Sequence, residues 1–599
     1  MMRGPMLLAA VLLGTVAVAL GAGRVEGELA QAPTPQRIAA LQAEAEQAGW
    51  GSVAHDLRGA ALSLYEKQGA QTQAWYYLYR WASLFSVTED QAIAGWIESI
   101  KRSGADPAKW GAGFRPSGHP LVDFWPADLR TFALASPEFS DQFFTLISPL
   151  DQPAMVMSIL AALWTRQPAD FKDYANLALA IAVVYDVPPP PSWPHGQVST
   201  QALPRQLPPP EAVFAFFVKA DRAGITLQHL RALPAAELKF VVDTTASYDE
   251  LVWAQKNVQT PLSQLARVYD VVRYRRDRLD NGVLLWPQPS YRLMDILQAG
   301  GICVDQAYFA ATVGKAKGVP TLLFRGAGLD GRHAWFGFLD DNGHWQLDCG
   351  RYADQKLVAG VAYDPQTWTD ISDHELTFLT EGFRRLPLYK TSRMHSQFAA
   401  VYYDAGEFAA AARAARTAVN IERRNLDGWN ILIRAQQHLG ENSKQLEAIY
   451  QEGARAFQRY PDIETEFKAL LSRSLRARGE VSAADFAERS DARKYDQADR
   501  ADLGVRQASD ILKRSLDSDD MNTRIRTFYS VLNTYGRGAG VDFFDRVVRP
   551  FVEHMLRNDQ PREAMQAVTQ ARRVLRVEPN SQLEGDLNAL ADQAQKALN

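Results

Sequence analysis

The chain has 599 residues, of which 47% are hydrophobic and 22% are charged, and its formal net charge is −4. This composition is ordinary for a globular protein, and the length corresponds to about four domains of ~150 residues each. Nucleic-acid-binding proteins need a concentrated basic face, which this chain does not show. Nucleic acid is therefore excluded as an expected partner.

The N-terminal segment has the order of a secretory signal. Arg3 precedes an apolar run from Met6 to Ala22, and small residues then lead into a polar stretch. This is the pattern of a signal peptide, and the run is shorter than the ~20 residues of a stable membrane span. We predict a signal peptide over residues 1–26 and a periplasmic or secreted protein. An uncleaved anchor is the alternative, and only that alternative would bring the chain to a membrane.

The first long region, residues 36–186, is expected to be helical. Apolar residues recur there at helical spacing, as at Leu57, Ala61 and Tyr65. The aromatic residues between Trp75 and Trp81 fit a helix-packing core better than a saccharide-binding surface. A proline-rich stretch over 187–210 forbids helix and predicts a connector, interpreted as a stiff spacer. Helices are expected to resume over 211–258.

The texture changes over residues 259–385, where helix and strand patterns alternate. The expected elements are a helix from Pro261 to Arg278, a second helix after Gly300-Gly301, and strands at Thr321–Arg325, His333–Phe338 and His344–Cys349. The sequence Asp340-Asp341-Asn342-Gly343 between the last two strands is a hairpin signal. We therefore expect a central α+β domain between mostly helical flanks.

The last region, residues 394–599, is again expected to be helical. Gly406 and Gly440 each lie between two predicted helices and are 34 residues apart, which is the period of a tetratricopeptide array. The next interval, to Gly479, is 39 residues, so the repeat is irregular. We interpret the region as tetratricopeptide-like, with a concave surface for a protein partner.

The chain has only two cysteines, and one of them lies in a reactive context. Cys303 follows Gly300-Gly301 at the start of the predicted helix, where the helix dipole lowers a thiol pKa. His333 begins a predicted strand and could take the thiol proton. Arg332, just before it, is interpreted as a solvated strand-edge residue, with contact to an acidic substrate group as the alternative.

Asp348 lies 15 residues after His333. Folding the hairpin at its midpoint, between Asp340 and Asp341, places Asp348 opposite His333, where a carboxylate could orient the imidazole. Cys349 then points to the opposite face and is expected to be a buried or lightly exposed free thiol. His344 is the other histidine of this hairpin, but no metal-ligand spacing accompanies it, and we expect neither a metal nor a cofactor.

Four stretches of this region, GGICVDQAYFAA, GVPTLLFRGAG, RHAWFGF and WQLD, resemble the transglutaminase-like, papain-related superfamily over about residues 260–370. The resemblance implies a papain-like α+β fold, a thioester intermediate and the catalytic residues Cys303, His333 and Asp348. The backbone N–H of Cys303 is one expected oxyanion donor. The family usually takes the second donor from an upstream side chain, for which Trp286 is preferred over the alternatives Gln288 and Tyr291.

The expected function is an exported cysteine enzyme that acts on peptide or protein amides through a Cys-His-Asp triad. Hydrolysis is favoured over cross-linking, because hydrolysis needs no second amine site. A catalytically silent scaffold that binds proteins through its helical repeats is the main alternative. A small-molecule acyltransferase is a third interpretation, and no cofactor-binding signature supports it.

Overall fold

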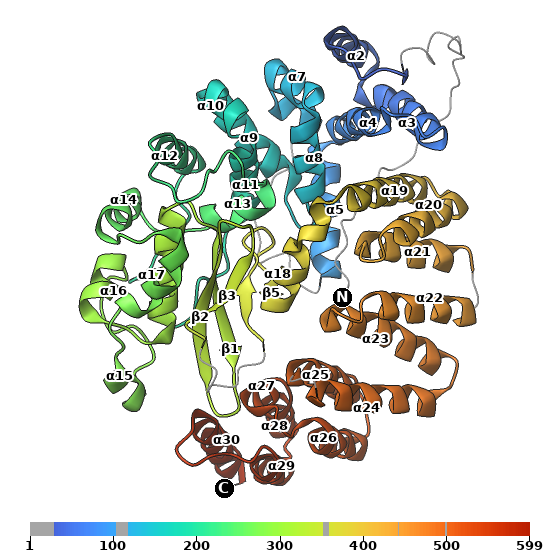
Figure 1. The fold of residues 1–599 in the computed structure, drawn as a ribbon. Helices are drawn as coiled ribbons and strands as arrows, with labels where there is room; N and C mark the ends of the chain where they lie inside the picture. Colours follow the sequence, from blue (N-terminus) through green and yellow to red (C-terminus); the bar gives the residue numbers. More distant parts are fainter. Residues whose placement is uncertain (1–28, 104–117, 352–358, 441–442, 498–499, 599) are drawn as a thin grey trace.

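The computed structural model describes residues 29–103, 118–351, 359–440, 443–497 and 500–598. The expected signal peptide, over residues 1–26, lies outside these ranges. The described chain is mixed α+β and mostly helical, with one five-stranded antiparallel sheet in the order β3-β2-β1-β4-β5 (Figure 1). None of the helices in the described ranges combines the length and the apolar character needed to cross a membrane.

The N-terminal part is helical up to Asn257. Its elements are α2 (Pro35–Ala48), α3 (Trp50–Glu66), α4 (Thr72–Ser86), α5 (Glu89–Arg102), η1 (Leu121–Phe124), α7 (Ala127–Ala135), α8 (Pro137–Leu146), α9 (Pro153–Arg166), α10 (Pro168–Asp173), α11 (Ala175–Tyr185), α12 (Pro210–Arg222), α13 (Ala235–Val242) and α14 (Tyr248–Asn257). Proline in the first turn starts several of these helices, because its missing N–H costs nothing there. The aromatic run of α4 forms core, as expected: Trp81 is fully buried and packs on Phe143 and Phe144.

The proline-rich segment has no helix or strand, as predicted, but it is not a solvent-exposed spacer. Trp193, His195 and Val198 are buried, and the Trp193 ring lies 5.1 Å from that of Trp368. The spacer interpretation is therefore wrong. Prolines prevented regular structure, while the apolar side chains between them packed into the same core as the sheet.

The central part carries the sheet. Its elements are η2 (Leu262–Val271), α15 (Arg276–Asp280), α16 (Leu293–Ala299), α17 (Cys303–Ala316), β1 (Thr321–Ala327), β2 (Arg332–Leu339), β3 (Trp345–Cys349), β4 (Val361–Tyr363), β5 (Asp370–Ser372), α18 (Asp373–Thr380) and η4 (Gly382–Arg385). The three expected strands are confirmed. The expected single helix from Pro261 to Arg278 is wrong: the chain forms the 3-10 helix η2 and the short helix α15, because backbone hydrogen bonds to Gly301 hold residues 273–275 between them extended.

The C-terminal part is a succession of helices. They are α19 (Pro387–Asp404), α20 (Phe408–Ile421), α21 (Leu426–His438), α22 (Ser443–Ala456), α23 (Pro461–Ala477), α24 (Val481–Gln497), α25 (Ala501–Leu516), α26 (Met521–Tyr535), α27 (Gly540–Phe543), η5 (Phe544–Val548), α28 (Arg549–Arg557), α29 (Pro561–Val574) and α30 (Gln582–Leu598). Neighbouring helices pack in pairs, and together they follow an arc that begins beside α3 and α4 and ends beside the β1–β2 hairpin (Figure 1).

Contacts at both ends of this arc join it to the rest of the chain. At its start, Tyr402 donates to Glu66 at 2.9 Å and Arg58 pairs with Glu407 at 2.9 Å. At its end, the backbone N–H of Val541 donates to Gly328 O and that of Leu583 to Asp330 O, each at 3.0 Å. The chain therefore curves back on itself, and the C-terminal helices contact the loop between β1 and β2, just before His333.

Candidate active site

Cys303 occupies the first turn of α17, as the sequence predicts. The thiol is partly buried, and the backbone N–H groups of Ala334, Val304 and Cys303 act to lower its pKa. Burial nevertheless raises the pKa of Cys303 above its ordinary value, and the charge of Asp305 adds to this rise. The expectation of a lowered thiol pKa is therefore wrong, because desolvation outweighs the amides at the helix start.

His333 lies on β2, directly before Ala334. Its Nε2 is 2.6 Å from the carbonyl oxygen of Gly350. A carbonyl oxygen only accepts hydrogen bonds, so Nε2 carries the hydrogen and, in the neutral ring, Nδ1 carries the lone pair. The ring is 9% exposed and stacks at 6.2 Å on Trp335, which fixes its plane. Cys303 and His333 line the same cavity.

The expected opposition of His333 and Asp348 is wrong. The turn is longer than a two-residue hairpin, because Asp340 Oδ1 accepts the N–H groups of Asn342 and His344, so that Leu339 pairs with Trp345. A bulge between Phe336 and Phe338 shifts the register again. The position opposite His333 thus lies past the end of β3.

Asp348 instead points to solvent. Its side chain is 71% exposed and forms an ion pair at 3.0 Å with Arg351. The structure therefore brings Cys303 and His333 together and leaves Asp348 away from the imidazole. Among the described contacts, the carbonyl of Gly350 takes the orienting position expected for a carboxylate. Cys349 is a free, buried thiol, as predicted, and burial raises its pKa to about 12.

Tyr269 and Gly350 are site residues that sequence reasoning missed. The Tyr269 hydroxyl donates to Ala334 O at 2.8 Å and lies 3.5 Å from both Cys303 O and His333 Nε2. Gly350 has φ +90°, and a Cβ built on it would lie 2.6 Å from the Tyr269 ring. A glycine directly after a strand was the available signal for this close approach; Tyr269 gave none, since it fell within the wrongly predicted helix.

A buried polar network lies beside Cys303. Asp305 is fully buried and accepts from Arg278 Nη1 at 2.8 Å, from Ile302 N at 2.8 Å and from the Tyr291 hydroxyl at 2.7 Å. The Tyr291 hydroxyl also lies 3.0 Å from His195 Nε2. This network ties the first turn of α17 to the proline-rich segment. Burial lowers the pKa of His195 to about 3, so that imidazole is neutral.

The candidate oxyanion donor Trp286 is not available to a substrate. Its indole N–H donates to Ser290 O at 2.9 Å, and the ring is buried between Tyr291 and Arg278. The expectation for Trp286 is therefore wrong, because a local turn accepts its only donor. Arg332 is exposed at the start of β2, as expected, but it is not free for a substrate, since it pairs with Asp545 and Asp586, each at 2.8 Å.

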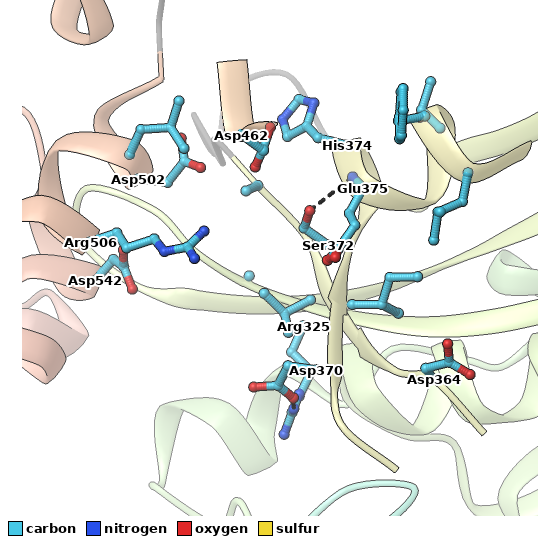
Figure 2. Close-up of a pocket in the computed structure, with 18 of the residues that line it drawn as sticks. Arg325, Asp364, Asp370, Ser372, His374, Glu375, Asp462, Asp502, Arg506 and Asp542 are labelled. Carbon is cyan, nitrogen blue, oxygen red and sulfur yellow. Dashed lines mark hydrogen bonds and ion pairs between the residues drawn. The ribbon is translucent and has the colours of Figure 1, made fainter. Parts of the chain in front are cut away.

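The cavity above Cys303 and His333 has a volume of about 1360 Å³ and is lined from two sides. Figure 2 shows one part of it, in which Arg325, Asp370 and Ser372 of the sheet face Asp502, Arg506 and Asp542 of the C-terminal helices. Many of these charges are paired within the wall, such as Arg325 with Asp370 and Arg500 with Asp462 and Asp502. The lining thus has both signs of charge and many exposed donors and acceptors.

Within the described ranges, no three His, Cys, Asp or Glu side chains gather as metal ligands do. Comparison with protein-family models gave no match, and comparison with curated proteins gave no significant relative.

Proposed function

We propose that the chain is a transglutaminase-like cysteine enzyme that transfers or hydrolyses acyl groups of peptide or protein amides. The observation that carries this proposal is the pairing of Cys303 at a helix start with His333 on the adjacent strand, beside a large cavity whose lining includes charged residues. Helix α17 against an antiparallel sheet also agrees with the papain-like arrangement that the sequence resemblance implies.

In the proposed reaction, His333 Nδ1 takes the Cys303 proton as the sulfur attacks an amide carbonyl, and the imidazolium then protonates the leaving amine. Gly350 O stabilises the protonated ring through Nε2. Because burial raises the thiol pKa, the resting thiol is neutral and the base acts during attack. Hydrolysis of the thioester by water completes the cycle.

A peptide or protein substrate fits the cavity. Its lining carries charged side chains of both signs that can hydrogen-bond to an extended backbone, and its volume of about 1360 Å³ exceeds the ~300–1,000 Å³ of typical small-molecule pockets. The tetratricopeptide-like helices supply one wall of this cavity, so the same array that would bind a protein partner also borders the proposed nucleophile. The signal-like N-terminus leads us to propose a periplasmic or secreted location.

The test is alkylation of the purified protein by an iodoacetamide probe from about pH 4 to pH 9, with the labelled cysteine identified by mass spectrometry. We expect Cys303 to react much faster than the buried Cys349, which serves as the internal reference. Cys303→Ala should remove the fast site. His333→Ala should shift the Cys303 profile to higher pH, because the thiol loses its base. A Cys303 rate that is unchanged by His333→Ala would contradict the proposal.

A catalytically silent interaction scaffold is the second candidate, and two observations favour it: the raised pKa of Cys303 and the outward position of Asp348. In that case Cys303 and His333 are a retained arrangement without turnover. Binding of a protein partner that is unchanged in the Cys303→Ala, His333→Ala double variant, together with slow alkylation of wild-type Cys303, would support the scaffold.

A further inference from the structure

An acyl-transfer site at Cys303 needs a second donor for the oxyanion, beside the backbone N–H of Cys303. None of the upstream candidates from the sequence can serve as this donor. The Trp286 N–H is bound to Ser290 O, the Tyr291 hydroxyl donates to Asp305, and Gln288 is exposed and does not line the cavity. The donor must therefore come from a residue that the sequence patterns did not single out.

Gln197 lies in the proline-rich segment, and its backbone is fixed on both sides. Its N–H donates to His195 Nδ1 at 3.2 Å, and its carbonyl accepts the backbone N–H of Trp286 at 2.8 Å. His195 is in turn hydrogen-bonded to Tyr291, and Tyr291 to Asp305 in the first turn of the nucleophile helix. This chain of short contacts holds Gln197 close to the N-terminus of α17.

The Gln197 side chain, unlike its hydrogen-bonded backbone, is unengaged and faces the cavity. It is partly exposed and lines the same cavity as Ile302 and Cys303. Within the described part of the chain its carboxamide has no hydrogen-bond partner, so its two N–H donors remain available. A fixed backbone with an unengaged donor on the wall of the cavity that Cys303 also lines is an arrangement suited to preorganised charge stabilisation.

We propose that Gln197 is a further catalytic residue, whose carboxamide N–H binds the oxyanion formed when Cys303 attacks an acyl group. This inference rests on the proposed function. In the step, the thiol proton moves to His333, the S–C bond forms, and the carbonyl π electrons move to oxygen, where Gln197 and the Cys303 N–H donate. The C=O bond then re-forms as the leaving group departs with its electron pair.

Two reagents separate this role from a structural one. p-Nitrophenyl acetate acylates a thiol through a tetrahedral oxyanion and releases p-nitrophenolate, whereas iodoacetamide alkylates by displacement and forms no oxyanion. The full-length protein with Gln197→Ala should show acylation of Cys303 slowed by about 100- to 1,000-fold, the loss typical of one oxyanion donor. Its alkylation by iodoacetamide should be unchanged.

The matched control is Gln201→Ala, which alters an exposed glutamine of the same segment outside the cavity and should change neither rate. Equal slowing of both reactions by Gln197→Ala would assign a structural role and overturn the inference, as would unchanged acylation. If wild-type Cys303 reacts with both reagents no faster than a free thiol, the proposed function fails and this inference fails with it. Slow acylation with normal alkylation supports Gln197 as the donor.

Discussion

The Tyr291 hydroxyl is the centre of the buried network beside Cys303, and Tyr291→Phe removes that hydroxyl alone. Tyr291 is 1% exposed, Asp305 is fully buried and His195 is 3% exposed, so no bulk solvent replaces the lost group. The change removes a 2.7 Å hydrogen bond to a carboxylate and leaves the His195 N–H without its 3.0 Å partner.

The size of the effect follows from these two losses. A hydrogen bond to a charged group contributes ~1.5–3 kcal/mol, and a buried donor left unsatisfied costs ~1–3 kcal/mol. The two terms overlap because they share one hydroxyl, so we expect a loss of about 3 kcal/mol in the free energy of unfolding of the central core.

Cys349 provides the assay. In a Cys303→Ala background it is the sole cysteine of the chain, and it is buried on β3. Pulse labelling of this thiol across a urea titration reports unfolding of the sheet, separately from the helical flanks. Tyr248→Phe is the control, because Tyr248 is 51% exposed and its ring contact with Phe216 survives the change. A shift below about 0.5 kcal/mol, the size of ordinary surface substitutions, would refute the network as a structural support.

Two further predictions concern the site's geometry and the chain's response to pH. Gly350→Ala should slow alkylation of Cys303 about tenfold or more, because the new Cβ, 2.6 Å from the Tyr269 ring, displaces that ring and the Gly350 carbonyl that holds His333. Gly382→Ala is the control, because a Cβ at Gly382 meets nothing within 4 Å. An unchanged alkylation rate in Gly350→Ala would contradict the prediction. Burial raises the pKa of Asp151 to about 8, so the folded state binds this proton more tightly than the unfolded state, and its contribution to stability falls as pH rises from about 4 to 8. Asp151→Asn should flatten the fall in urea midpoint over that range, and an equally steep profile in the variant would argue against it.

The strands and the nucleophile helix could be predicted because their signals are local. Alternating apolar residues, the glycines before Cys303 and the turn residues at 340–343 are all read within a few positions. The partner of His333 could not be predicted in this way. Its identity depends on the register of β3, and the side chain of Asp340 set that register by capping two backbone N–H groups of the turn.

Burial of the proline-rich segment could not be predicted from the sequence either. Its composition forbids regular structure, but whether it packs depends on Trp368 and Tyr291, which follow more than 90 residues later. The same holds for Arg332, whose partners Asp545 and Asp586 lie over 200 positions along the chain. Patterns in the sequence thus identified the groups that could react, and distant contacts determined what surrounds them.

The surroundings of Cys303 favour a thiol that stays neutral until it reacts. Asp305 lies two residues away, and its charge, with burial, raises the thiol pKa, while Arg278, Tyr291 and the Ile302 N–H hold that carboxylate in place. The backbone N–H groups of Ala334, Val304 and Cys303 oppose this rise in the pKa without overcoming it. A site of this kind needs a base in contact with the nucleophile during attack and donors for the charge that moves to the substrate. We propose His333 for the first role and Gln197 for the second, so the His333→Ala variant should lose activation of the thiol and the Gln197→Ala variant should lose stabilisation of the oxyanion.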